Sequence, residues 1–160
     1  MRRVELGAVI HNTPPERAYE QIARFDRFPD LAPHVQSTTV HATLPDPVGR
    51  SSWELHFRSG LLRWTEEERY RQAEGIIEFE QLSGDFDEFS GTWKVTASGA
   101  DTTVAFSAEF DFGIPSLEGI LDPIAERVIK ETVAWVIVGM FDEVDLEDQF
   151  ELVPVTTPGM

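Results

Sequence analysis

Two glutamates, Glu66 and Glu68, occupy alternate positions of the segment LLRWTEEERYR, residues 61–71, in step with its aromatic residues Trp64 and Tyr70. Such alternation is typical of a β-strand, and it places both acids on the same face as Trp64 and Tyr70. A carboxylate among aromatic rings costs several kcal/mol unless it is paired, hydrated or protonated, so its pKa should rise toward the range useful for proton transfer. We therefore predict that Glu66 and Glu68 are catalytic acid/base residues.

The turn that follows this segment indicates which face is solvated. A two-residue turn at 73–74 sets Arg69 beside Glu78 and Glu67 beside Glu80, which gives one face of charged pairs. The opposite face, which carries the two glutamates of the first motif, is then the inner one.

The preceding turn leads to the same assignment. A turn at 59–60 places Leu55 beside Trp64 and Trp53 beside Glu66, again on the apolar face. Two alternatives stay open: the hairpin slips by one residue and turns both acids outward, or the acids lie at the wet mouth of a pocket.

The inner face carries more aromatic rings than a core requires, whereas the facing helix carries the small residues Thr132, Ala134 and Gly139. Taken singly, such residues belong more often to a core than to a pocket, but together they favour a cavity for a hydrophobic ligand. The predicted substrate-binding residues are Phe28, Leu31, His34, Val35, Trp53, Leu55, Phe57, Trp64, Tyr70, Phe79, Gln81, Phe89, Trp93 and Thr132.

Other chemistry has little support in the sequence. The four histidines show no metal-binding spacing, no G-x-S-x-G elbow is present, and Asp111-Phe112-Gly113 lacks the other kinase motifs. The absence of cysteine excludes a disulfide framework, a thiol nucleophile and zinc–thiolate sites. We expect no metal and no cofactor.

Composition limits the partners. With 160 residues, 41% of them hydrophobic, the chain can form one stable core without a disulfide or a structural metal. A net charge of -16, which favours solubility, argues against nucleic acid and anionic membranes. No signal peptide or run of about 20 apolar residues is found, so we predict a cytoplasmic protein without a membrane span.

The pattern of elements predicts an α+β fold in which helices cover one face of an antiparallel sheet. Thr13 is expected to cap a helix that ends before Pro29, and Asp122 to open a long helix that runs to about Glu143. Strands are expected at 2–11, 35–43, 50–58, 61–72, 75–83, 88–97 and 102–112. We expect a single domain over 1–146 and a tail over 147–160.

The order of elements and three motifs, TPPERAY (13–19), FDRFPDLAP (25–33) and GDFDEFSGTW (84–93), resemble the START-like helix-grip (SRPBCC) superfamily. The likeness spans about residues 3 to 143 and is strongest to its bacterial polyketide aromatase/cyclase and coenzyme-Q-binding branches. It implies a seven-stranded antiparallel sheet that grips the C-terminal helix around a tunnel for polyketides, quinones or other lipids. It also implies that the second motif forms a lid pinned by Phe25, Phe28, Leu31 and Pro33.

The sequence departs from the aromatase/cyclase pattern at two positions. Glu68 aligns with a buried arginine and Val35 with an aromatic hydroxyl, so the group expected to polarise carbonyls is missing. The resemblance still predicts a polyketide cyclase or aromatase that directs ring closure or dehydration, in bacterial secondary metabolism such as antibiotic biosynthesis. The alternatives are a non-enzymatic carrier for a quinone or lipid, and a partner-binding module.

The partners are expected to be a hydrophobic small molecule or polyketide and, if a local basic patch exists, an acyl carrier protein. Such carriers are acidic, so docking would need Arg2, Arg3, Arg24 and Arg27 to form that patch. The protein is expected to be a monomer or a homodimer.

Overall fold

The computed structural model describes residues 1–147, 150 and 152. Within these residues, eight strands form one antiparallel sheet in the order β2-β3-β4-β5-β6-β7-β1-β8. The strands are β1 (Arg2–Ile10), β2 (Val35–Ala42), β3 (Val48–Phe57), β4 (Gly60–Arg71), β5 (Ile76–Gly84), β6 (Glu88–Ser98), β7 (Asp101–Asp111) and β8 (Val144–Leu146).

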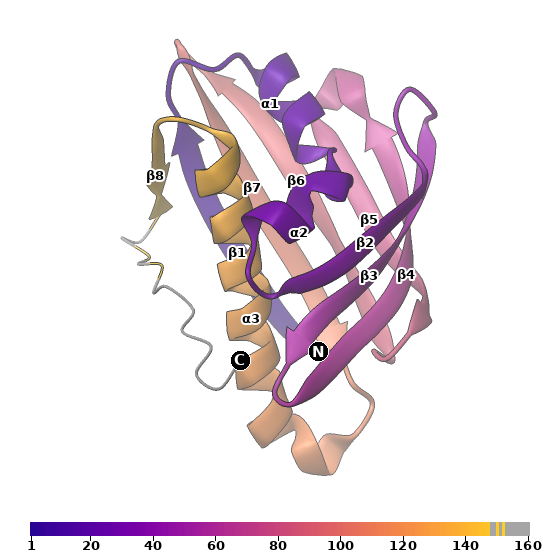
Figure 1. Cartoon of the computed structure of the whole chain (residues 1–160). Coiled ribbons are helices and arrows are strands. Elements are labelled where there is room, and N and C mark those ends of the chain that lie inside the picture. The colour runs from indigo at the N-terminus through magenta and orange to yellow at the C-terminus, as the bar shows by residue number, and fades with distance from the viewer. Residues whose placement is uncertain (148–149, 151, 153–160) are drawn as a thin grey trace.

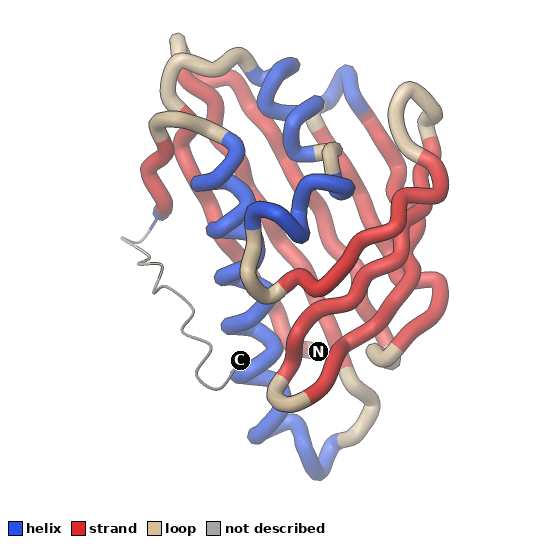
Figure 2. The backbone as a smooth tube through the Cα atoms, viewed as in Figure 1, coloured by secondary structure: helices blue, strands red, loops and turns tan. Residues whose placement is uncertain are grey.

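The larger helices lie on one face of this sheet, which curls around the long helix α3 (Figures 1 and 2). The helical segments are α1 (Pro15–Ile22), η1 (Phe25–Arg27), α2 (Phe28–Leu31), η2 (Gln72–Glu74), η3 (Pro115–Leu117) and α3 (Glu118–Met140). The predicted α+β helix-grip fold is confirmed. The sheet has one strand more than the expected seven, because the three-residue β8 pairs with β1 at the edge.

Period-two alternation explains how the sheet forms its inner layer. In β7, for example, Val104, Phe106, Ala108 and Phe110 are all buried, while the residues between them face outward. The inward side chains of β3 to β7 and β1 pack with α1, α2 and α3 into one core. The curvature of the sheet therefore leaves the possible ligand space between its concave face and α3.

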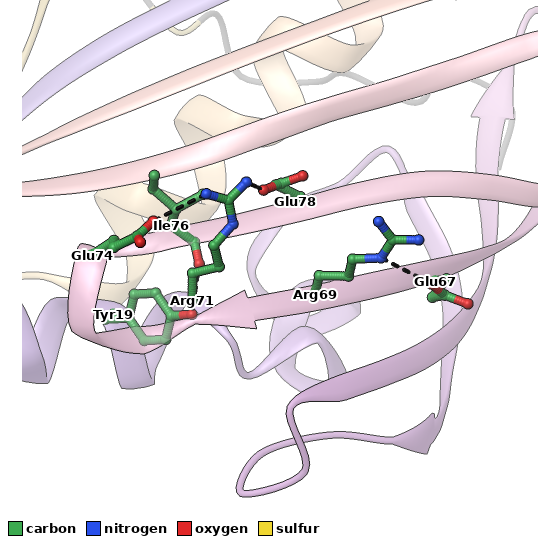
Figure 3. Close-up of polar contacts among 7 residues, drawn as sticks. All are labelled: Tyr19, Glu67, Arg69, Arg71, Glu74, Ile76 and Glu78. Carbon is green, nitrogen blue, oxygen red and sulfur yellow. Dashed lines mark hydrogen bonds and ion pairs between the residues drawn. The ribbon is translucent and has the colours of Figure 1, made fainter.

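The outer face is a layer of ion pairs, as the sequence predicted. Figure 3 shows Arg71 in contact with Glu74 and Glu78, and Arg69 with Glu67. All of these side chains are at least partly exposed to solvent. Exposed pairs of this kind contribute little stability, about 0–1 kcal/mol each, but they mark the face that does not bind a hydrophobic ligand.

The helix α1 is tied to the start of the central strand β5 by Tyr19, also seen in Figure 3. The Tyr19 hydroxyl donates a hydrogen bond of 2.8 Å to the carbonyl of Ile76. Burial raises the pKa of Tyr19 to about 12. The predicted cap is different: α1 begins at Pro15, and the Thr13 hydroxyl instead donates to the carbonyl of His11.

The long helix begins one turn earlier than predicted. It runs from Glu118, so the Asp122-Pro123 pair that was expected to open it lies inside its second turn. Proline removes one backbone N–H, which costs least near a helix start, and the apolar residues that follow it provide the buried face. The proline marked the predicted start of the helix, so the prediction lacked the exposed first turn that precedes it.

The predicted registers are correct on one side of β4 and shifted on the other. Arg69 lies opposite Glu78, as expected from the turn at 73–74. Trp53, however, lies opposite Trp64 and not Glu66, because the chain reverses at 58–59, where Arg58 has a left-handed φ of 58°. A shift of two residues keeps every side chain on its face, so the inner face was still assigned correctly.

The strand β8 ends at Leu146, and the single domain over 1–146 stays a prediction. Most of the predicted tail, residues 147–160, lies outside the described residues. The two described positions beyond Glu147, Phe150 and Leu152, are half-buried against the core. Among the described residues, no helix is both long enough and apolar enough to cross a membrane.

Candidate functional site

The site is built on the paired strands β3 and β4. Trp53 and Trp64 lie directly opposite each other, and their rings are parallel with centroids 5.8 Å apart. Alternation along β4 then directs Glu66 and Glu68 to the same inner face. Both acids are buried, at 4% and 0% exposure, so the possibilities that they face outward or lie at a wet mouth are excluded for this structure.

Glu66 forms part of the wall of a cavity between the sheet and α3. Its Oε1 accepts a hydrogen bond of 2.8 Å from the indole Nε1 of Trp64, two residues earlier on the same strand. An N–H donated to a carboxylate stabilises the ionised form. Glu66 is therefore a buried acid with one fixed donor and with access to the cavity.

Glu68 lies next to Glu66 but does not line the cavity. The hydroxyl of Ser51, on β3, lies 3.2 Å from both carboxyl oxygens of Glu68 and donates its single proton to them. Ser51 in turn accepts a hydrogen bond of 2.8 Å from the Nε1 of Trp53. The indole N–H of Trp64 thus bonds directly to the Glu66 carboxyl, whereas that of Trp53 is linked to the Glu68 carboxyl through the Ser51 hydroxyl.

Burial sets the protonation of this pair. It raises the pKa of Glu66 to about 7, against the lowering effect of hydrogen bonds from Trp64 and Glu68. It raises the pKa of Glu68 to about 10, and the charge of Glu66 and the hydrogen bond between the two carboxyls raise it further. At neutral pH Glu68 is therefore the member of the pair that keeps its proton, and Glu66 is the more acidic of the two.

The cavity itself is narrow. Its volume is about 60 Å³, whereas a pocket for a drug-sized ligand measures roughly 300–1,000 Å³. The lining residues are Phe25, Phe28, Trp53, Leu55, Trp64, Glu66, Phe79, Phe89, Trp93, Phe106, Ile129, Thr132 and Val133. In this conformation the space holds a few water molecules or a small group, since one water needs about 10–15 Å³.

The small residues of α3 do not create the space that the sequence suggested. A Cβ atom added at Gly139 would lie 2.9 Å from Leu31, because the side chain of Leu31 in the lid fills this position. Ala134 is fully buried in the core, and the Thr132 hydroxyl donates 2.7 Å to the carbonyl of Val128. The expected gap is therefore partly occupied by the protein itself.

The structure brings more than half of the predicted binding residues into the cavity wall. They are Phe28, Trp53, Leu55, Trp64, Phe79, Phe89, Trp93 and Thr132. Four lining residues were missing from the predicted set: Phe25, Phe106, Ile129 and Val133. Phe25 belongs to the predicted lid, and the other three carried a usable signal as apolar residues at strand or helix spacing.

The remaining predicted binding residues lie outside the wall and are held by other contacts. Gln81 exchanges hydrogen bonds with the backbone of Phe86, and the Tyr70 hydroxyl is 3.3 Å from that of Thr43. The ring of Phe57 lies 5.9 Å from that of Phe112. Leu31, the last residue of α2 in the lid, is half-buried, and Val35, at the start of β2, is buried; neither of them lines the cavity.

His34 also lies beside the cavity and not in its wall. Its Nε2 is 3.6 Å from Oε1 of Glu131 on α3, which also accepts 3.2 Å from Nε of Arg127. Burial lowers the pKa of His34, although the charge of Glu131 opposes this effect. The cluster joins the segment after the lid to α3.

The predicted lid is present as η1 and α2, with Phe25 and Phe28 buried and Pro33 exposed. The Phe28 ring meets those of Phe25, Trp53 and Trp93 edge-on, with centroids 5.4, 5.2 and 6.3 Å away. The lid thus closes the cavity through contacts between aromatic rings, and these rings must move apart to admit a larger ligand. In the described part of the chain, no three His, Asp or Glu side chains are placed to hold a metal ion.

Solved structures share this architecture. A protein from Thermus thermophilus is 27% identical, with a TM-score of 0.76 over 86% of this chain and 93% of its own. The Zhui aromatase/cyclase from Streptomyces is 15% identical, with a TM-score of 0.71 over 87% and 90% of the two chains. A START superfamily protein from Mycobacterium smegmatis is 15% identical, with a TM-score of 0.73 over 89% and 98%.

A comparison with curated proteins gave no match. The family described as polyketide cyclase / dehydrase and lipid transport matches residues 12–136, which include the lid, the glutamate pair and most of α3. The chain therefore belongs to this polyketide cyclase/dehydrase and lipid-transport family of START-like proteins.

Proposed function

We propose that this protein binds a poly-ketone intermediate in the aromatic cavity and directs its ring closure or dehydration by acid/base catalysis. The observation that carries the proposal is Glu66, a carboxyl with a pKa of about 7 at the wall of a hydrophobic cavity. A general base is most effective when its pKa lies near the working pH. Membership of the family supports a hydrophobic ligand.

In this reaction Glu66, as carboxylate, removes a proton from a carbon between two ligand carbonyls. The enolate carbon then forms a bond to another carbonyl carbon of the same chain, and the oxygen of that carbonyl takes the proton back from Glu66. Dehydration follows when Glu66 removes the next proton and returns it to the departing hydroxyl as water leaves. Cavity walls that exclude water and favour one fold of the chain add the positioning effect.

Glu68 acts in this scheme through Glu66 and does not touch the ligand. As the neutral acid, it donates a hydrogen bond that keeps Glu66 partly ionised in an apolar setting. The indole N–H groups of Trp53 and Trp64 are already directed to Ser51 and Glu66, so they are not free to hold a carbonyl oxygen. Protonated Glu66 is a donor at the cavity wall that can take this role.

Ligand binding requires the lid to move, because a cavity of about 60 Å³ does not hold a polyketide. A freely diffusing ligand fits the surface better than one delivered on an acidic carrier protein. Three of the four arginines considered for docking pair with carboxylates: Arg2 with Glu126, Arg3 with Glu5 and Arg24 with Asp26. The fourth, Arg27, donates to Gln21.

A second function, a non-catalytic carrier of a quinone or similar lipid, is favoured by one observation. Within the described residues the cavity wall contains no Arg, Lys or His, and its Thr132 hydroxyl is already bonded to backbone. A pocket without a cationic side chain lacks the strongest means of polarising a carbonyl. The glutamate pair would then only set the polarity of the cavity.

The test compares Glu66→Gln with Glu67→Gln, its neighbour on the outer face. A synthetic aromatic poly-ketone serves as the substrate, and cyclised products are quantified against the spontaneous reaction. We expect Glu66→Gln to lose the rate enhancement by about a hundredfold or more while the dissociation constant changes less than twofold. Equal products and rates for both variants would refute the acid/base role and support the carrier.

A further inference from the structure

The buried glutamate pair has no positive side chain beside it. Among the described residues, Glu66 is the one ionisable group of the thirteen that line the cavity, and neither Glu66 nor Glu68 takes part in an ion pair. Residues 148, 149, 151 and 153–160 contain no Lys, Arg or His that could supply one. Charge balance at this site must therefore come from protons or from a ligand.

We propose that the cavity recognises an organic cation, a protonated amine or a quaternary ammonium group, with Glu66 as its counter-ion. This inference rests on the proposed function for the location of the site and adds the chemical group that the ligand presents there. A hydrophobic ligand with a basic nitrogen would place that nitrogen against Glu66 and its carbon skeleton toward the lid.

The aromatic wall supports this choice of ligand. Eight of the thirteen lining residues carry an aromatic ring, and three of them are tryptophans, Trp53, Trp64 and Trp93. The π-electrons of indole and phenyl rings attract cations, most strongly where water is excluded, and such rings surround quaternary ammonium ligands in known cages. A wall of rings with one carboxylate is thus suited to a cation, whereas an anion would meet repulsion from Glu66.

The size of the cavity fits a group and not a whole ligand. A volume of about 60 Å³ exceeds the requirement of one water several times over, so the closed cavity has room for a small head group and not for a whole ligand. The rest of a larger ligand would extend past Phe28 once the lid moves. The closed cavity therefore describes the recognition site of the cationic head.

The net charge of the whole protein also favours a cationic ligand. A net charge of -16 creates a negative potential that raises the local concentration of cations and repels anionic ligands. A bound cation would also replace the proton on Glu66, because it stabilises the carboxylate. Binding is then linked to pH, and affinity falls as the pH drops below about 7, the pKa of Glu66 in the free protein.

Choline and its neutral isostere 3,3-dimethylbutan-1-ol provide the test, since they share shape and hydroxyl and differ in charge. Their dissociation constants are measured by calorimetry at pH 6 and pH 8 with the wild-type protein. We expect choline to bind more tightly than the isostere, and about tenfold more tightly at pH 8 than at pH 6, as one proton is displaced. The isostere should show less than a twofold pH effect.

Two variants assign the effect to the cavity. Glu66→Gln should weaken choline binding by about tenfold or more at pH 8 and leave the isostere within twofold. Glu67→Gln removes the same formal charge from the outer face and should change choline binding less than twofold. Thermal unfolding of each variant shows that the fold is retained.

The proposal is overturned if choline binds no more tightly than its isostere, if neither compound binds, or if the two variants lose affinity equally. These outcomes are separate from the fate of the acid/base proposal. A Glu66→Gln variant that loses turnover but binds choline unchanged would keep the enzyme and refute the cation. Choline binding that depends on Glu66, without any acceleration of ring closure, would support the cation site and refute the acid/base role.

Discussion

Trp53 and Trp64 stack across β3 and β4 and direct their indole N–H groups to the two halves of the glutamate pair. Trp64 donates 2.8 Å to Glu66, whereas Trp53 donates 2.8 Å to Ser51, whose hydroxyl serves Glu68. The carboxyl that faces the cavity thus receives a direct N–H, and the carboxyl behind it receives a hydroxyl. This difference helps to make Glu66 the more acidic member of the pair.

Removing the Trp64 donor should raise the pKa of Glu66 further. In Trp64→Phe the ring remains but the hydrogen bond to the ionised carboxylate is lost, which corresponds to about one pH unit. A titration of ¹³C-labelled glutamate carboxyls by NMR measures the shift. Trp93→Phe changes another ring of the same cavity wall and serves as the control; equal shifts in both variants would show that the indole N–H is unimportant.

Glu68 should make the folded protein less stable as the pH rises. Its pKa in the folded state, about 10, lies far above the ordinary value of 4.5, so the folded state holds a proton that the unfolded state releases. The stability linked to that proton is complete below about pH 4.5 and is lost as the pH rises toward 10. Each such proton lowers the free energy of unfolding by about 1.4 kcal/mol per pH unit.

Urea denaturation between pH 6 and pH 9 measures this slope. In Glu68→Gln the neutral amide replaces the protonated acid, so the slope should decrease by about one proton and the variant should be more stable than wild type at pH 9. Glu67→Gln on the outer face should keep the wild-type slope. A Glu68→Gln slope that equals that of wild type would mean that Glu68 is ionised throughout this range.

The lid residue Phe28 should control the size of ligand that the cavity accepts. It is 3% exposed and contacts the rings of Phe25, Trp53 and Trp93, so Phe28→Ala should destabilise the fold by about 3–5 kcal/mol and enlarge the cavity. The fluorescence of the neutral dye Nile red should increase with this variant. Phe110→Ala removes a fully buried ring outside the cavity wall and provides a matched loss of stability. If both variants bind the dye equally, the effect reflects loosening of the fold and not opening of the lid.

The sequence predicted the inner face of the sheet correctly, because the face on which a side chain lies depends only on whether its position in the strand is odd or even. A turn predicted one position too late in the chain shifted the partner of Trp53 by two residues, yet Glu66 and Glu68 stayed on the concave face. The same alternation identified most of the aromatic wall. Local periodicity is therefore sufficient to locate the site on β4.

The volume of the cavity and the difference between the two acids could not be read from the sequence. Both depend on side chains that meet across long distances in the chain, such as Leu31 against Gly139 and Ser51 against Glu68. Phe25 and Phe28 narrow the space from the lid, which the sequence predicted as a cover without fixing its depth. Packing at this level follows from shape, and composition does not specify it.

The edge strand β8 should be held in place by His11 most strongly at low pH. The His11 ring lies between two carboxylates, with Nε2 2.7 Å from Asp145 on β8 and Nδ1 3.3 Å from Asp101 on β7. Hydrogen bonds to Asp145 and then to Asp101 raise the pKa of His11 above its ordinary value of 6.5. Because the pKa of His11 is higher in the folded state than in the unfolded state, this stabilisation is complete below about pH 6.5 and is lost as the pH rises through the raised value.

Hydrogen exchange of the β8 amides Val144–Leu146, corrected for the intrinsic pH dependence of exchange, should show lower protection at pH 9 than at pH 6. His11→Gln should remove this pH dependence while the amides of β6 remain protected as in wild type. Equal protection of β8 at both pH values in the wild-type protein would contradict the role of the His11 imidazolium.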